Sequence, residues 1–140
     1  MAILTTAELE TLKIANNAEK AKIEARRAEI SAEMERLKNL VGTREELRAA
    51  NDKIKELKRE DRRLSWTLDS LDRAMAEAEM YSRMYSEYFN REYATLSENE
   101  QETVARAIHM AYELGHSAGV SEIENYLMDT FEMIAPLINK

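Results

Sequence analysis

The longest pattern in the chain is a row of mainly apolar positions between Leu47 and Phe89, spaced alternately by three and four residues. This is the spacing of a helix with one apolar seam, and about six heptads exceed the three or four that indicate a coiled coil. A helix of this length is stable in water only where its seam is covered. The seam consists of Leu47, Ala50, Ile54, Leu57, Asp61, Leu64, Leu68, Leu71, Met75, Ala78, Ser82, Tyr85 and Phe89.

The segment before Gly42 carries two apolar rows on opposite sides of one helix, at roughly 100° per residue. One row holds larger side chains, namely Leu12, Ile23, Ile30, Met34, Leu37 and Val41. The other holds Ile14, Ala18, Ala21, Ala25, Ala28 and Ala32. Because one glycine separates the two helical segments, the simplest arrangement is an antiparallel hairpin that folds back at Gly42. The larger row then faces the second helix and the alanine row faces outward.

Three sequences of the form S/T-x-x-E, beginning at Thr5, Thr43 and Ser97, are typical of helix starts. They predict helices over about residues 6–41 and about residues 44–95, and a third helix from about residue 98. Gly42 stands where the end of the first helix favours a residue that tolerates positive φ.

Two glycines, Gly115 and Gly119, predict a break between the third helix and a fourth over about residues 120–135. A single continuous helix is the alternative. Pro136 is expected to end the regular structure, because proline lacks a backbone N–H.

The second long helix gains another apolar side after Trp66, which lies opposite the seam together with Met80, Met84 and Tyr88, with Tyr81 nearby. A helix that is apolar on two sides is buried on both. We expect the last two helices to cover it through Val104, Ile108, Tyr112, Ile123, Leu127, Phe131 and Ile134. The fold class is therefore all-α, with a coiled-coil hairpin domain over residues 1–96 and a helical unit over residues 97–140 packed on the distal half of the second helix.

Composition supports this fold and excludes several classes of site. Among 140 residues there are three glycines, one proline and no cysteine, too few turn residues for a sheet protein and none of the thiols that disulfides or Cys-ligated metals require. No apolar run approaches the roughly 20 residues of a membrane span, and the N-terminus does not resemble a secretion signal. We expect a cytoplasmic protein with no membrane contact, no cofactor and no bound metal.

Charge is divided unevenly along the chain, whose net charge is −7. Residues 1–70 hold fifteen bases and fourteen acids, whereas residues 71–140 hold five bases and thirteen acids. The one basic segment, Lys53–Arg63, is interleaved with acids at spacings that favour pairs within a helix. We therefore do not expect nucleic acid as a partner.

Asp61 occupies a seam position where an unpaired carboxylate is expensive. In the hairpin, Arg27 lies within about one turn of its level, so we predict an Arg27–Asp61 pair that fixes the register. The alternative is that Asp61 lies in a solvated stretch. His109, Glu113 and His116 share the spacing of some metal ligands, but the second copy of the motif that di-iron bundles contain is absent.

Two surfaces are candidates for binding. The alanine row (Ala18, Ala21, Ala25, Ala28 and Ala32) is the predicted homodimer interface, although alanine is also simply the best helix former. The second candidate is a partner or ligand surface formed by Trp66, Met80, Tyr81, Met84, Tyr85 and Tyr88, since methionine and tyrosine make adaptable contacts. At helical spacing, however, such residues more often form core.

These features favour a non-catalytic interaction protein that binds a partner protein and regulates or inhibits it, as small acidic accessory factors do, some of them phage-encoded. No pattern in the sequence indicates an enzyme's nucleophile, base or cofactor loop. One alternative is an oligomeric sponge that sequesters a small anionic, nucleotide-like ligand between protomers through Arg83, Arg91 and Tyr85. Another alternative is a coiled-coil assembly scaffold.

Overall fold

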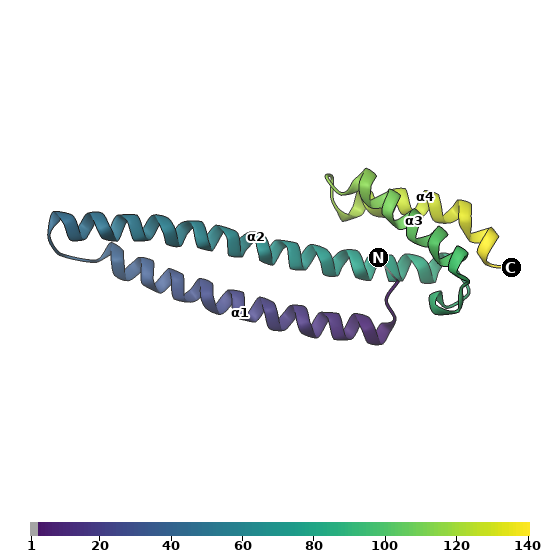
Figure 1. Cartoon of the computed structure of the whole chain (residues 1–140), viewed down its shortest axis with the longest axis horizontal. Coiled ribbons are helices and arrows are strands. Elements are labelled where there is room, and N and C mark those ends of the chain that lie inside the picture. Colours follow the sequence, from purple (N-terminus) through teal and green to yellow (C-terminus); the bar gives the residue numbers. More distant parts are fainter. Residues whose placement is uncertain (1–2) are drawn as a thin grey trace. The chain divides into compact units, whose positions relative to one another are not determined.

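The computed structural model describes residues 3–140, and these residues are helical without any strand (Figure 1). The elements are α1 (Thr6–Lys38), α2 (Arg44–Tyr88), a short 3-10 turn η1 (Tyr93–Thr95), α3 (Glu98–Gly115) and α4 (Val120–Ile138). Over the described residues, no helix combines the length and the apolar character needed to cross a membrane.

Contacts divide the chain into two units, each of which has its own core. The terminal unit comprises Met1–Leu12 and Arg73–Lys140, and the central unit comprises Lys13–Asp72. Both α1 and α2 contribute residues to both units. This division differs from the one expected at residue 96, because the last turns of α2 share their buried side chains with α3 and α4.

The core of the central unit follows the heptad spacing. Its buried members are Ile30, Leu37, Ala50, Ile54 and Leu57, with Met34, Leu40 and Leu64 packed against them. Ion pairs flank this core, from Lys20 to Asp72 at 2.6 Å and from Arg26 to Glu60 at 2.8 Å. Val41 was expected in the same apolar row but is 92% exposed, because α1 ends at Lys38 and leaves it in the connecting turn.

The terminal unit contains the larger core, in which α3 and α4 pack on the last turns of α2. Phe89 stacks on Tyr85 at 4.7 Å between ring centroids and meets Phe131 of α4 edge-on at 5.0 Å. Of the side chains expected to cover α2, all except Tyr112 are buried or packed against this core. The further members include Met80, Tyr81, Met84, Leu96, Ala107, Ala111, Ala135 and Ile138.

The second helix ends at Tyr88, not near residue 95 as its pattern predicted. The side chain of Asn139, near the C-terminus, caps this end of α2 and explains the difference. Its Nδ2 donates to the carbonyl of Tyr88 at 2.8 Å and its Oδ1 accepts from the amide of Asn90 at 3.0 Å. The chain can therefore leave the helix with its backbone groups satisfied.

The predicted break between α3 and α4 is present, and each glycine has its own reason. Gly119 has φ +112°, a conformation that side chains disfavour. At Gly115, a Cβ would lie 2.7 Å from the backbone nitrogen of Ile123, so glycine permits the close approach of α4. Gly42, by contrast, has no positive φ, which corrects the expectation for that position.

The helix starts lie where the sequence predicts them, whereas α4 ends later than predicted. Thr5, Thr43 and Ser97 each accept a hydrogen bond from the amide three residues later, at 3.1–3.2 Å. Pro136 lies inside α4, which continues to Ile138. Proline is tolerated there because it is exposed in the last turn, where water can reach the carbonyl that its missing N–H leaves unpaired.

Candidate functional site

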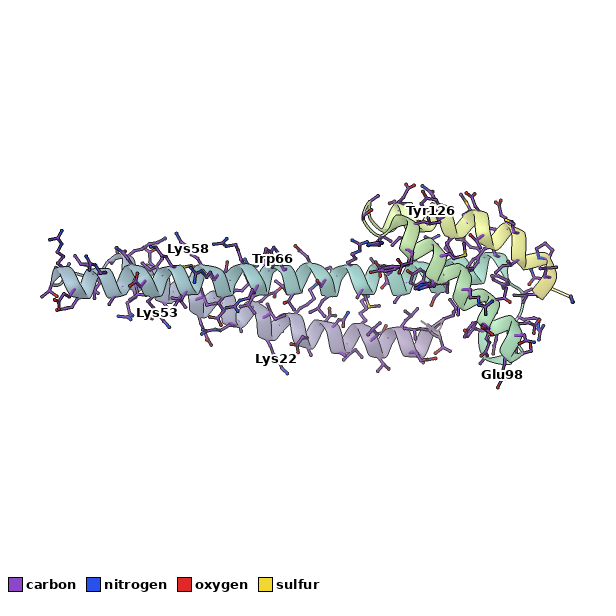
Figure 2. The ribbon with its side chains drawn as sticks, turned by 45° about the horizontal axis from the view of Figure 1, so that its top comes forward. Lys22, Lys53, Lys58, Trp66, Glu98 and Tyr126 are labelled. Atoms are coloured by element: carbon purple, nitrogen blue, oxygen red, sulfur yellow. The ribbon has the colours of Figure 1, made fainter. Side chains whose placement is uncertain are left out.

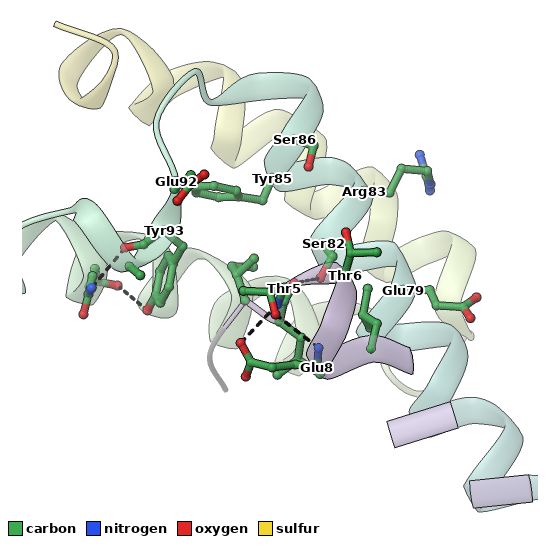
Figure 3. Close-up of a pocket in the computed structure, with 15 residues that line it drawn as sticks. Thr5, Thr6, Glu8, Glu79, Ser82, Arg83, Tyr85, Ser86, Glu92 and Tyr93 are labelled. Atoms are coloured by element: carbon green, nitrogen blue, oxygen red, sulfur yellow. Dashed lines mark hydrogen bonds between the residues drawn. The ribbon is translucent and has the colours of Figure 1, made fainter. Parts of the chain in front are cut away.

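A groove of about 810 Å³ opens within the terminal unit (Figure 3). It lies between the N-terminal segment, the last turns of α2 and the segment that leads into α3. Its apolar side chains include Leu4, Leu9, Tyr85 and Tyr93. Polar side chains, among them Thr6, Ser86 and Gln101, share the lining, so the groove has a mixed surface.

Local hydrogen bonds hold the N-terminal wall of the groove. The Thr5 amide donates to Glu8 at 3.3 Å, and the Glu8 amide donates to the Thr5 hydroxyl at 3.1 Å, which begins α1 at this wall. Ser82 of α2 donates its hydroxyl proton to the carbonyl of Leu4 at 2.9 Å. The segment before α1 is therefore tied directly to α2.

Two tyrosines form the opposite side. The hydroxyl of Tyr85 donates to the carbonyl of Arg91 at 2.5 Å, and its ring meets Tyr93 edge-on at 5.8 Å. Gln101 Nε2 donates to the carbonyl of Tyr93 at 3.0 Å, which joins the wall to α3. Burial raises the pKa of both tyrosines above its ordinary value, so they stay neutral at physiological pH.

The groove is lined by more acids than bases. Glu8, Glu79 and Glu92 line it together with a single base, Arg83. The guanidinium of Arg83 is engaged by two other carboxylates, those of Glu124 at 2.6 Å and Glu87 at 3.2 Å. The lining therefore offers apolar side chains, carboxylates and hydroxyls to a bound molecule, and its one base is already paired.

The predicted methionine and tyrosine surface is mostly core, which corrects that candidate. Met80, Tyr81, Met84 and Tyr85 are buried and Tyr88 is half-buried, since α3 and α4 cover this side of α2. Of this surface only Tyr85 reaches the groove. Trp66 is 66% exposed and belongs to the central unit, on α2 (Figure 2).

The other predicted positions are in the central unit. All five alanines of the alanine row are exposed on α1. Arg27 and Asp61 are in contact, with Nε–Oδ1 at 2.9 Å and Nη2–Oδ2 at 3.3 Å. Their side chains are 36% and 31% exposed, so the pair is less buried than a seam position predicts. Hydrogen bonding from Arg27 lowers the pKa of Asp61 below its ordinary value.

The residues proposed for an anionic ligand are engaged within the chain. Arg91 pairs with Glu100 at 3.1 Å and donates to the carbonyls of Thr95 and Ile138, while Arg83 pairs with its two glutamates. Tyr85 is buried. These three groups hold the C-terminal helices on α2, which leaves no open cationic cluster among them.

The side chains of His109, Glu113 and His116 do not come together as one cluster. His109 lies 3.8 Å from Glu113, whereas His116 turns its Nδ1 toward the carbonyl of Tyr112 and stacks on that ring at 5.1 Å. Between residues 3 and 140, no group of three or more His, Asp or Glu side chains is placed to hold a metal ion.

Sequence reasoning missed the groove because its walls come from three separated segments, and no spacing rule connects them. The capping box at Thr5 and the tyrosines were visible, but their proximity was not. Comparison of the chain with known protein families, curated proteins and solved structures finds no match.

Proposed function

We propose that this protein is a non-catalytic helical interaction protein whose terminal unit binds a segment of a partner protein and so regulates or inhibits it. The observation that carries the proposal is the groove, whose lining combines apolar side chains with carboxylates and hydroxyls. Its volume of about 810 Å³ is enough for several side chains of a bound segment. Bound peptides use apolar anchors for affinity and polar rims for orientation.

The test begins with capture of partners from the native host by the tagged full chain, followed by mass spectrometry. Ser86 lines the groove and is exposed, so Ser86→Trp fills the groove without disturbing the core. Ser70 is an exposed serine of the same helix outside the groove, which makes Ser70→Trp the matched control. We expect Ser86→Trp to lower affinity for the captured partner at least about tenfold and Ser70→Trp to leave it unchanged. Equal affinity for all three proteins would exclude the groove.

We further propose that α1 and α2 of the central unit pair as an antiparallel coiled coil. Support comes from the order of contacts, since Arg27 meets Asp61 whereas Lys20, nearer the N-terminus, meets the later residue Asp72. The three-and-four spacing of Ala50, Ile54 and Leu57, all buried, agrees with a seam.

The alanine row is proposed as the interface of a homodimer. Its five alanines are exposed in the single chain, and small side chains allow two helix backbones to approach closely. A carboxylate there opposes such an approach, so Ala25→Glu should convert the dimer to monomer in sedimentation velocity. Ala49→Glu introduces the same charge at an exposed alanine of α2 and should leave the dimer intact. A wild-type monomer at concentrations up to about 100 μM would overturn the proposal.

A further inference from the structure

The outer face of α4 carries a row of three large apolar side chains, of which two are largely exposed and the third, Tyr126, is 36% exposed. Tyr126, Met133 and Leu137 are spaced by seven and four residues, so they fall within about 40° of one another around the helix axis. Met133 is 76% exposed and Leu137 is 62% exposed. Tyr126 marks the start of this row on α4 (Figure 2). We call these three residues the α4 row.

One edge of the row borders the core and the other borders acids. On the inner side of α4, Ile123, Leu127 and Phe131 are fully buried. On the opposite edge, Glu122 and Asp129 lie within about 60° of the row. Glu132 lies about 120° from the row, on the side of α4 that is near Tyr88 of α2. The row is therefore the apolar half of a two-sided surface whose other half carries negative charge.

These acids have no compensating base in the helix. α4 contains four acids and no lysine or arginine, and Lys140 is the first base after it. Glu124 is neutralised by Arg83 at 2.6 Å. The charges of Glu122, Asp129 and Glu132 enter no ion pair within residues 3–140. Glu132 lies near the hydroxyl of Tyr88, a neutral group.

From this arrangement we infer that the outer face of α4 binds a basic amphipathic helix of a partner protein. Apolar side chains of that helix cover the α4 row, and lysine or arginine side chains along its edge meet Glu122 and Asp129. A second copy that docks through its own α4 is the wrong occupant, because two such faces would bring four like charges together without a base. The inference rests on the proposed function only in that the chain binds another protein, and it does not require the groove.

The test uses the full chain and a fluorescently labelled synthetic peptide as the probe. The probe is an 18-residue helix former with leucines spaced by three and four residues and lysines on the flanking positions. Its counterpart keeps the leucines and replaces every lysine with glutamate. By fluorescence anisotropy, we expect the lysine peptide to bind and the glutamate peptide to bind at least about tenfold more weakly.

Two variants locate the binding on α4. Met133→Glu combined with Leu137→Glu removes apolar contact, and Glu122→Gln combined with Asp129→Asn removes charge while keeping the apolar row. Each should weaken binding at least about tenfold, and raising the salt from about 0.05 M to 0.5 M should weaken the wild-type interaction more than that of the charge variant. Glu10→Gln combined with Glu19→Gln removes two exposed charges of α1 and serves as the matched control.

The outcomes separate this inference from the proposed function. The α4 inference is wrong if the lysine peptide does not bind the wild type. It is also wrong if this peptide binds the wild type, the two α4 variants and the α1 control with equal affinity. Both results are independent of binding in the groove. If Met133→Glu with Leu137→Glu converts a dimer to monomer, the face is a self-interface and the inference is also wrong. The proposed function fails separately, when Ser86→Trp leaves affinity for the captured partner unchanged.

Discussion

Asp61 is the one charged residue of a mainly apolar seam, and two hydrogen bonds from Arg27 hold its carboxylate. Partial exposure of both side chains means that water also solvates the pair. Such a pair adds little to stability, because desolvation and ordering offset much of the attraction. Its proposed effect is on register, since only one alignment of the two helices brings Arg27 and Asp61 together.

Replacing Asp61 with leucine tests this role. Asp61→Leu completes the apolar seam, so we expect the Tm to rise by a few degrees, measured by circular dichroism. We also expect the oligomeric state to become heterogeneous, measured by sedimentation velocity, because the charge that selects one register is gone. An unchanged Tm together with a single species would count against the pair as a register device.

Replacing either glycine of the α3–α4 turn with alanine should lower the free energy of unfolding, for a different reason at each position. Gly115→Ala places a Cβ against the backbone of Ile123, which can yield only if α4 moves, so we expect a loss of about 2–3 kcal/mol in chemical denaturation. In Gly119→Ala the added Cβ meets no atom within 4 Å, but alanine must adopt the backbone angle φ +112°. We expect this strain to lower the free energy of unfolding by about 1–2 kcal/mol. Equal losses would show that helix approach is not the constraint at Gly115.

At the scale of elements, α4 is divided between a core side and an outer side. Phe131 is fully buried against Phe89 and Tyr88, whereas Met133, two residues later, is 76% exposed. We expect Phe131→Ala to lower the free energy of unfolding by about 3–5 kcal/mol and Met133→Ala to change it by less than about 0.5 kcal/mol. Urea denaturation of the two variants measures both. A large loss at Met133 would place that residue in the core.

Acids within the helices make stability depend on pH. Arginine partners lower the pKa of Glu60, Asp61 and Glu33, and the Ser97 cap lowers the pKa of Glu100. Because each folded-state pKa lies below the ordinary value, the stabilisation is complete above about pH 4.5 and is lost as the pH falls through the folded-state values. We expect the Tm to fall in this acid range, with a shallower fall in Asp61→Asn. An identical acid profile in that variant would contradict the assignment.

At the scale of the whole molecule, the two units differ in how much core they hold. Fifteen buried side chains form the main cluster of the terminal unit, against five in that of the central unit. Amides of α3, α4 and the last turns of α2 should therefore exchange hydrogen more slowly than those of residues 13–72. Hydrogen exchange with mass spectrometry measures the difference. Protection of residues 18–32 that grows with protein concentration would be the signature of the proposed dimer.

The sequence by itself determined the helices and most of their starts. Hydroxyl–acid pairs at Thr5, Thr43 and Ser97 act within one turn, so local chemistry is sufficient to place them. The apolar periodicity likewise separated the buried faces of α2, α3 and α4 from most of their exposed ones. Both signals depend on neighbours three or four residues away, which a sequence shows directly.

Only the tertiary structure decided where α2 ends, which methionines and tyrosines are buried, and that a groove exists. Asn139 caps a helix that ends at Tyr88, and Ser82 holds the carbonyl of Leu4, so the partners are separated by 51 and 78 residues in sequence. Pairings of this kind depend on chain geometry that no local rule encodes. The groove is the sum of several such pairings, because three segments must meet before its walls exist.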